Sequence, residues 1–277
     1  MKDDTDYNPD WLRAHYDEMG DREWERFSKS PADEVSLFIH THYLRQFVRS
    51  GWRVLDVGAG PGRFTQVLVE MGCRVVVADI SQEQLELHSK HARELGFEHA
   101  VEARLQLDVC DMSELASESF DAVVCYGGPI SYVLERAPMA LRECVRVCRT
   151  GGNVLVSVMS LWGGAHRFLQ GVLAVPSDIN RKITETGNLT PRNWDGAVHY
   201  CHMFRAGELR EMVGQAGLKV LALSASNCVS TAHDDHLSHI KEDPRKWQEV
   251  LRMELEACRE AGCLDMGTHI IVVGRKI

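Results

Sequence analysis

A glycine-rich turn in the first half of the sequence has the residue types and spacing of a ligand-binding loop. An apolar run at residues 54–57 contains Asp56 and leads into Gly58, Ala59, Gly60 and Gly62, after which helical periodicity begins at Arg63. Glycine adopts positive φ angles and has no Cβ, so a ligand can approach the backbone closely. The pattern therefore predicts a buried strand, a tight turn and a helix whose first residues face a bound ligand.

Two ligand classes use such a turn, dinucleotides and S-adenosylmethionine. The dinucleotide pattern has a third glycine at the position that Arg63 occupies here, where it allows close helix packing. Asp56, two residues before the first glycine, would also repel a pyrophosphate. A zwitterionic methionyl group beside a sulfonium tolerates that carboxylate, so the turn favours S-adenosylmethionine.

Two further acidic residues stand where later strands are expected to end. Asp79 follows the apolar run 76–78, where a carboxylate can accept both ribose hydroxyls, although Asp79 or Ser81 could instead cap the next helix. Asp108 ends the run 105–107 and could accept from an adenine amino group, with Asp111 as the alternative partner. Acids at successive strand ends support the same ligand.

Apolar, strand-like runs alternate with helix-period segments along the chain and would position these acids. This alternation predicts βαβ units and a Rossmann-like, mostly parallel sheet with helices on both faces. Its strand ends would share one edge, where ligands bind. We expect one domain, residues 1–277, divided into an N-terminal helical cap (1–50), a cofactor-binding half (51–159), a lid or substrate insertion with little periodicity (160–205) and the rest of the sheet (206–277). Expected strands are 53–57, 74–80, 103–109, 120–126, 153–159, 218–224 and 269–274, and expected helices are 63–71, 82–95, 138–148, 208–216 and 244–261.

Charge and composition exclude several classes of protein. The net charge is −9, with Lys and Arg scattered, so no basic stripe for nucleic acid is expected. No apolar run approaches the roughly 18 residues of a membrane span, and residues 1–6 lack a signal-peptide core. Nine cysteines, most of them in apolar runs, predict buried free thiols in a reducing compartment, the cytoplasm.

The succession of motifs resembles the class I S-adenosylmethionine-dependent methyltransferases over residues 50–160. The resemblance rests on the glycine loop, on Asp79 and Asp108, and on residues 120–124 and 145–152. It implies a seven-stranded sheet whose last strand, residues 268–273, runs antiparallel. Residues 23–26, 60–64 and 127–131 also resemble a group of prokaryotic methyltransferases, although Tyr132 stands where members often have His. The cofactor contacts that the resemblance implies are Asp56, Gly58, Ala59, Gly60, Gly62, Asp79, Ile80, Asp108, Val109 and, in the segment 125–131 beside the methionine portion, Tyr126.

Histidines are the candidate catalytic residues. His199 and His202 close the expected insertion, and imidazole titrates near neutrality, so either could be a general base or a structural, hydrogen-bonded side chain. His233, His236 and His239 recur every three residues, which on one helix spreads them over too wide an arc for a single ligand sphere. We therefore expect no metal site.

These observations together predict a methyltransferase that moves a methyl group from S-adenosylmethionine to a small molecule and leaves S-adenosylhomocysteine. The alternatives are a non-catalytic or protein-directed S-adenosylmethionine-binding protein and, with Arg63 against it, a nucleotide-cofactor oxidoreductase. We expect neither a nucleic-acid nor a membrane partner. The sequence leaves a monomer and a homodimer both open.

Overall fold

The fold is known from a computed structural model that describes residues 6–195, 197 and 199–277. Residues 1–5 of the predicted cap, and residues 196 and 198 of the predicted insertion, lie outside the described part. The helices are α1 (Pro9–Met19), α2 (Arg22–Glu25), α3 (Pro31–Phe47), α4 (Arg63–Glu70), α5 (Gln82–Glu94), α6 (Pro129–Tyr132), α7 (Ala137–Val147), α8 (Leu161–Arg167), α9 (Leu169–Ala174), α10 (Ser177–Thr186), α11 (Ala206–Gln215), α12 (Asp234–Lys241) and α13 (Pro244–Ala257), with 3-10 turns η1 (Glu98–Ala100) and η2 (Leu134–Arg136). The strands are β1 (Arg53–Val57), β2 (Arg74–Asp79), β3 (Val101–Gln106), β4 (Phe120–Cys125), β5 (Cys148–Met159), β6 (Asn188–Leu189), β7 (Cys201–His202), β8 (Leu218–Ala225) and β9 (His269–Lys276).

The seven-stranded sheet has the order β3-β2-β1-β4-β5-β9-β8. Strands β1 to β5 pair in parallel, and β9 pairs antiparallel with both β5 and β8, so β9 alone runs against the others. The predicted Rossmann-like fold with an antiparallel last strand is confirmed. The order reverses at β1, so the carboxyl ends of β1, β2 and β4 border one crevice.

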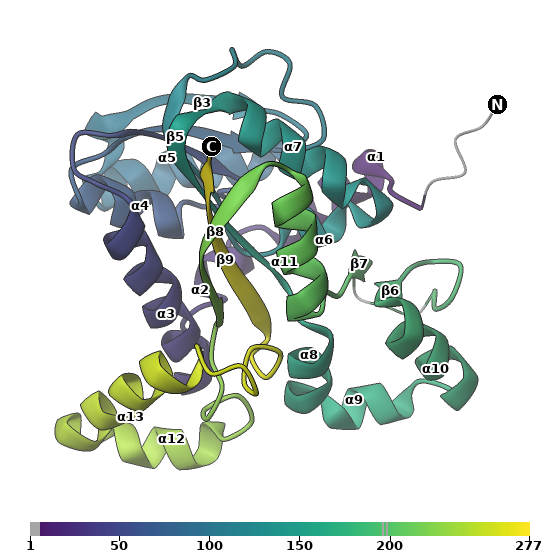
Figure 1. Ribbon diagram of the computed structural model, residues 1–277. Coiled ribbons are helices and arrows are strands. Elements are labelled where there is room, and N and C mark those ends of the chain that lie inside the picture. Colours follow the sequence, from purple (N-terminus) through teal and green to yellow (C-terminus); the bar gives the residue numbers. More distant parts are fainter. Residues whose placement is uncertain (1–5, 196, 198) are drawn as a thin grey trace.

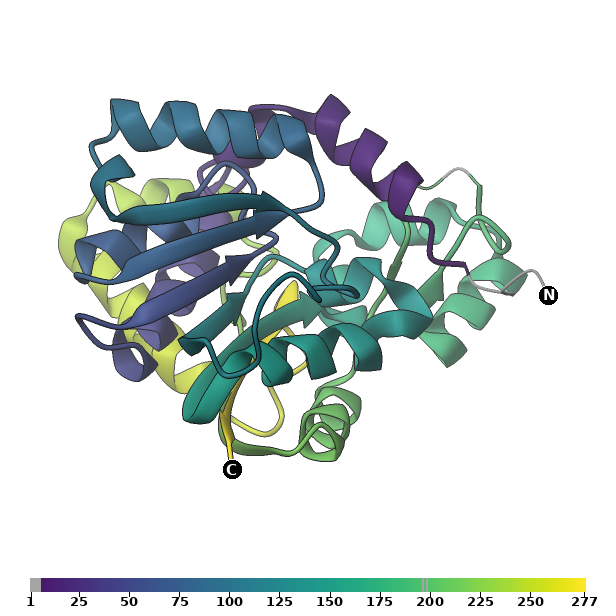
Figure 2. The same ribbon diagram turned by 90° about the horizontal axis from the view of Figure 1, so that it is seen from above.

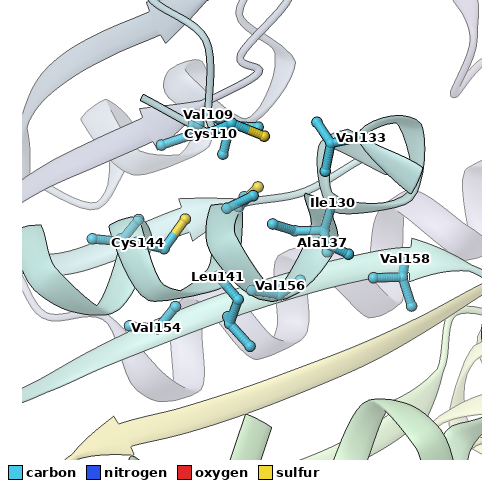
Figure 3. Packing of buried hydrophobic residues seen from close by; sticks show 14 of the residues in the cluster. Val109, Cys110, Ile130, Val133, Ala137, Leu141, Cys144, Val154, Val156 and Val158 are labelled. Carbon is cyan, nitrogen blue, oxygen red and sulfur yellow. The ribbon is translucent and has the colours of Figure 1, made fainter. Parts of the chain in front are cut away.

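Two hydrophobic cores cover the two faces of this sheet. On one face, Leu55 of β1 and Val123 of β4 pack with α7 and α11, and Figure 3 shows Ala137, Leu141 and Cys144 of α7 in one cluster with Val154 and Val156 of β5. On the other face, the alternate strand residues pack with α3, α4, α5 and α13. Successive side chains of a strand point to opposite faces, so each strand is buried on both sides. All nine cysteines are free, and eight of them are buried, as predicted.

The N-terminal helices stand over the carboxyl edge of the sheet. Helix α1 begins at Asn8, whose side chain accepts the amide of Trp11, and α3 begins at Ser30, whose side chain accepts the amide of Asp33. Figure 2 shows α1 beyond the end of α5, between the sheet and the segment that carries α8 to α10. The helical cap predicted for residues 1–50 is thus helical in its described part.

The segment 160–205 holds more regular structure than its weak periodicity indicated. It forms α8, α9 and α10, of seven, six and ten residues, and the paired strands β6 and β7. Helices this short contain two or three turns, so they give little repeating hydrophobic pattern. Figure 1 shows them projecting below the sheet, on the opposite side from α12 and α13.

The third strand ends earlier than predicted, at Gln106 rather than Val109. The chain turns immediately afterwards, where Asp108 and Asp111 form an isolated bridge and the Asp108 side chain accepts the amide of Cys110 at 2.8 Å. Asp108 therefore lies on a loop beyond the strand. Within the described residues, no helix is long and apolar enough to cross a membrane.

Candidate functional site

A cavity opens where β1, β2 and β4 end, beneath the N-terminal helices. We call it the glycine-loop cavity. It contains about 580 Å³ of atom-free space, open side included. Its described lining residues are Tyr7, Leu12, Tyr16, Glu23, Arg26, Val57, Gly58, Gly60, Asp79, Ile80, Leu107, Asp108, Val109, Tyr126, Gly127, Pro129 and Tyr132.

The floor of the cavity requires glycine at two positions of the loop. Gly58 has φ +64°, and a Cβ there would lie 2.3 Å from Pro129 Cγ. Gly62 has φ +100° at the start of α4, and a Cβ there would lie 2.8 Å from His88 Cδ2. Both positions therefore exclude a side chain, and of the two Gly58 presents its backbone to the cavity.

Asp79 is held against the loop by two backbone amides. Its Oδ2 accepts from Gly60 N at 2.8 Å and its Oδ1 from Ser81 N at 2.9 Å. Burial raises the pKa of Asp79 to about 6, and these two amides oppose the rise. Ser81 also caps α5, its side chain accepting the amide of Gln84, so the cap at this position is Ser81 and Asp79 is left to face the cavity.

Asp108 faces the cavity together with Val109 and is tied to the roof. Tyr7 donates from its hydroxyl to Asp108 Oδ2 at 2.8 Å. The Asp111 side chain instead accepts the amide of Ser113 at 3.1 Å and is exposed, outside the lining. Asp108 is thus the acid of this pair that a ligand in the glycine-loop cavity would meet.

Three of the predicted contact residues lie behind the loop surface and do not line the cavity: Asp56, Ala59 and Gly62. Asp56 is buried, and its Oδ2 accepts from the Thr65 hydroxyl at 2.6 Å. Burial raises the pKa of Asp56 to about 7. This hydrogen bond joins β1 to α4. The backbone of the turn lies over the Asp56 carboxyl. The remaining predicted residues, Gly58, Gly60, Asp79, Ile80, Asp108, Val109 and Tyr126, all line the cavity.

Glu23 and Arg26 in the roof are functional candidates that the sequence alone did not single out as site residues. Arg26 Nε lies 3.0 Å from Glu23 Oε1, and Arg26 donates from Nη1 to Gly127 O at 3.2 Å. A Cβ at Gly127 would lie 2.4 Å from Arg26 Nη2, so the Gly127–Gly128 turn is shaped around the guanidinium. The signal was present in the run 23–26, which mixes acid, aromatic and basic residues, but nothing local indicates which element it covers.

The donor set fits S-adenosylmethionine. Glu23, Asp79 and Asp108 give the lining three acids, and Arg26 is its one cation among the described residues. An acidic wall with tyrosine rings suits a sulfonium, and Arg26 suits a carboxylate. Ile80 and Val109, on the loops after β2 and β3, offer apolar side chains for a base next to Asp108.

A second cavity, the apolar cavity, lies inside the segment 160–205. It contains about 1160 Å³ of atom-free space, open side included, between α8, α9, α10, β7 and the end of β5. His199 lines it. The His199 ring meets Tyr132 edge to face, with centroids 5.7 Å apart, and Tyr132 lines the glycine-loop cavity. Tyr132 therefore lies at the boundary of the two cavities.

The two predicted catalytic histidines differ in position. Burial lowers the pKa of His199, and the neighbouring His15 and Arg26 lower it further. His202 lines neither cavity, because its Nδ1 lies 2.6 Å from Asn188 Oδ1 and its Nε2 lies 2.6 Å from Glu208 Oε1. These contacts join β7 to β6 and α11 and fit the structural alternative for His202, and the base role of either histidine stays a prediction.

The other histidine cluster is peripheral. His233 precedes α12, its ring centroid lies 6.1 Å from that of His236, and His239 Nδ1 lies 2.9 Å from Asp235 O. Within the described ranges, no group of three or more His, Cys, Asp or Glu side chains is placed to hold a metal ion.

Comparison with known proteins matches the same part of the chain. Residues 54–152 match the methyltransferase domain family. The ubiquinone biosynthesis O-methyltransferase of Xanthomonas axonopodis pv. citri is 28% identical over 174 residues, 62% of this chain and 64% of the relative. The mitochondrial ubiquinone biosynthesis O-methyltransferase of Mus musculus is 32% identical over 117 residues, 40% of this chain and 30% of the relative. The alignments thus span less than two thirds of the length of these two relatives.

A solved structure shares the fold. The crystal structure of an S-adenosylmethionine-dependent methyltransferase from Mesorhizobium loti superposes with a TM-score of 0.56 at 18% identity and covers 85% of this chain and 96% of that one. The strand order, the glycine loop with its facing acids and the matched domain agree with one another. Residues 54–152 thus match a methyltransferase domain, within a chain that has the fold of S-adenosylmethionine-dependent methyltransferases.

Proposed function

We propose that the chain binds S-adenosylmethionine in the glycine-loop cavity and transfers its methyl group to an oxygen atom of a small molecule. The observation that carries the proposal is the placement of Asp79, fixed to Gly60 by a 2.8 Å hydrogen bond and facing the cavity beside the glycine backbone. Asp79 would accept the ribose hydroxyls and Asp108 the adenine amino group. The O-methyltransferase names of the relatives support oxygen as the acceptor atom.

The chain's own residues would act mainly by positioning. When bound, the cofactor supplies an activated methyl group on a sulfonium, so the protein must align the acceptor and exclude water. Alignment can supply roughly 7–11 kcal/mol of the barrier. Arg26 would hold the methionine carboxylate, the tyrosines would surround the sulfonium, and His199 would take the acceptor's proton.

Isothermal titration calorimetry with S-adenosylhomocysteine and with NADH tests the proposal against its rivals. We expect micromolar or tighter binding of S-adenosylhomocysteine and none of NADH. Binding of NADH alone would instead favour the oxidoreductase. Transfer of a labelled methyl group from S-adenosylmethionine to a small-molecule panel, read by mass spectrometry, separates an enzyme from a non-catalytic or protein-directed binding protein.

A further inference from the structure

The lining of the apolar cavity is uncharged. Among its described lining residues none is Asp, Glu, Lys or Arg. Moving an unpaired charge from water into such surroundings costs several kcal/mol. Phe168, Ile183 and Trp194, which come from α8–α10 and the turn after β6, give the cavity large apolar side chains. These walls suit a neutral, mainly apolar occupant.

Most polar side chains of this lining already form hydrogen bonds within the protein. Ser160 donates to Asp265 O at 3.0 Å, Asn180 donates to Val172 O at 3.2 Å and Thr184 donates to Arg181 O at 2.8 Å. Thr268 Oγ1 lies 3.3 Å from His269 Nδ1. The polar group that the lining offers at the wall with the glycine-loop cavity is the imidazole of His199.

The His199 end of the apolar cavity is the end next to the expected methyl donor. Tyr132 contacts His199 on one side. Its hydroxyl lies 4.0 Å from Sδ of Met159, which also lines the apolar cavity. The same tyrosine lines the glycine-loop cavity beside Gly127 and Pro129. A molecule in the apolar cavity would therefore present one end to Tyr132 and the donor.

This inference rests on the proposed function and makes it specific. We infer that the apolar cavity is the acceptor site, and that it takes an uncharged phenol with an apolar body whose hydroxyl lies at His199. The phenol oxygen forms the new bond to the methyl carbon, the carbon–sulfur bond of the donor breaks with its electron pair left on sulfur, and the phenol proton passes to the His199 imidazole.

The charge and the acidity of the acceptor group distinguish a phenol from an amine, a carboxylic acid and an aliphatic alcohol. An aliphatic amine is a cation at neutral pH and a carboxylic acid is an anion, so the uncharged lining disfavours both. An aliphatic alcohol is a much weaker acid than a phenol, whose pKa is about 10 as in tyrosine. A neutral imidazole, which burial favours at His199, can accept a phenol's proton as the oxygen–carbon bond forms.

Calorimetry on the full chain saturated with S-adenosylhomocysteine tests the inference with three probes of one shape: 1-naphthol, 1-naphthoate and 1-naphthylmethylammonium. We expect 1-naphthol to bind at least tenfold more tightly than either ion. The variant Gly164→Leu should weaken 1-naphthol binding at least tenfold and leave S-adenosylhomocysteine binding unchanged. Gly164 lines the apolar cavity in α8, and a Cβ there meets nothing within 4 Å, so this lining position has room for an added side chain.

The matched control is Gly214→Leu, in α11 and outside both cavities, where a Cβ also meets nothing within 4 Å. It should leave all three affinities unchanged. The inference is overturned if 1-naphthol does not bind, if an ion binds as well as 1-naphthol, or if Gly164→Leu has no more effect than its control. These outcomes, with S-adenosylhomocysteine still bound, leave the proposed function standing, whereas failure of S-adenosylhomocysteine to bind removes both.

Discussion

Tyr7 and Asp108, 101 residues apart in the chain, are joined by a hydrogen bond of 2.8 Å from the tyrosine hydroxyl to Oδ2 of the aspartate. Asp108 also accepts the amide of Cys110 through Oδ1. One carboxylate thus fixes both the loop after β3 and the roof of the glycine-loop cavity. Burial and the adjacent Asp108 charge raise the pKa of Tyr7 well above its ordinary value, so this tyrosine remains a hydrogen-bond donor.

The variant Tyr7→Phe should release S-adenosylhomocysteine faster. It removes a hydrogen bond to a charged group, worth about 1.5–3 kcal/mol, while it keeps the ring that lines the cavity. We expect the dissociation rate, measured by stopped-flow displacement, to rise about tenfold or more. Tyr43→Phe, on α3 and outside the lining, is the control. An unchanged rate in Tyr7→Phe would show that the hydrogen bond does not hold the roof closed.

The variant Asp79→Ala should lose most of its affinity for S-adenosylhomocysteine. It removes two charge-assisted hydrogen bonds to the ribose, each worth about 1.5–3 kcal/mol, so the dissociation constant should rise about a hundredfold or more. Asp111→Ala removes an exposed acid near Asp108 and should bind normally. Calorimetry on both variants checks the assignment, and equal affinities in Asp79→Ala and the wild type would refute it.

Affinity for S-adenosylhomocysteine should also depend on pH through Asp79. Its pKa is raised to about 6, chiefly by burial and also by the nearby Glu23, so the carboxyl of the free protein gains a proton as pH falls below about 6. The ribose hydroxyls donate to the ionised form, so affinity should be constant above this pH and decline below it. Calorimetry between pH 5 and 8 should give this profile for the wild type. Asp79→Asn should flatten it.

The variant His199→Gln should slow methyl transfer to 1-naphthol by about 10²–10⁴-fold, the range of general-base catalysis, with S-adenosylhomocysteine affinity unchanged. His202→Gln is the control, because His202 contacts Asn188 and Glu208 and lines neither cavity. The control should keep the wild-type rate and lose thermal stability. Equal rates in the two variants would remove His199 from the proposed role.

The pH profile of transfer distinguishes a base from a structural histidine. Burial lowers the pKa of His199, and the cations and rings around it are His15, Arg26, His269 and Tyr132. The rate should therefore be constant near neutrality and fall only below pH 6.5, where the imidazole gains a proton. In His199→Gln the remaining rate should not show this fall.

Asp56 should make the ligand-free protein less stable as pH rises. The folded protein holds the Asp56 proton more tightly than the unfolded chain, because burial raises the pKa to about 7 from 3.8. The stabilisation is complete below about pH 4 and is lost as pH rises through about 7. Asp56→Asn keeps an acceptor for Thr65 and removes the titration, so its stability relative to the wild type should improve by about 2–3 kcal/mol between pH 5 and pH 8.

Urea unfolding at the two pH values measures this difference. Asp111→Asn, which alters an exposed acid, serves as the comparison and should show no such improvement. A parallel pH dependence in the wild type and Asp56→Asn would mean that other groups control stability in this range.

The sheet and its glycine loop could be predicted because their signals are contiguous. β1 has the predicted bounds, and β2 ends at Asp79, one residue before the predicted end. The glycines at 58 and 62 are required by local backbone angles and by neighbours that follow from the fold itself. Local chemistry determines the position of Asp79 at the end of β2, between the amides of Gly60 and Ser81, and its contact with a ligand stays a prediction.

The roof and the second cavity could not be predicted because they depend on contacts between distant segments. Arg26 reaches Gly127 across 101 residues, and no local pattern records that contact. His199 and His202 are three residues apart in one stretch, yet one lines the apolar cavity and the other is bound by Asn188 and Glu208. The choice between them depends on how β6, β7 and α11 pack.

The roof of the glycine-loop cavity consists of residues that leave the ribosome before any strand of the sheet. Helices α1 and α2 have little core of their own, since Leu12 is their one buried residue, and they attach through polar contacts such as Gln84 to Tyr16 O at 2.9 Å. They can therefore dock only after Asp108 and Gly127 have been synthesised, and we expect them to detach again with little effect on the sheet. Exchange of one cofactor molecule for the next would then need only this local undocking, and we expect amide hydrogens of α1 to exchange with solvent faster than those of β1.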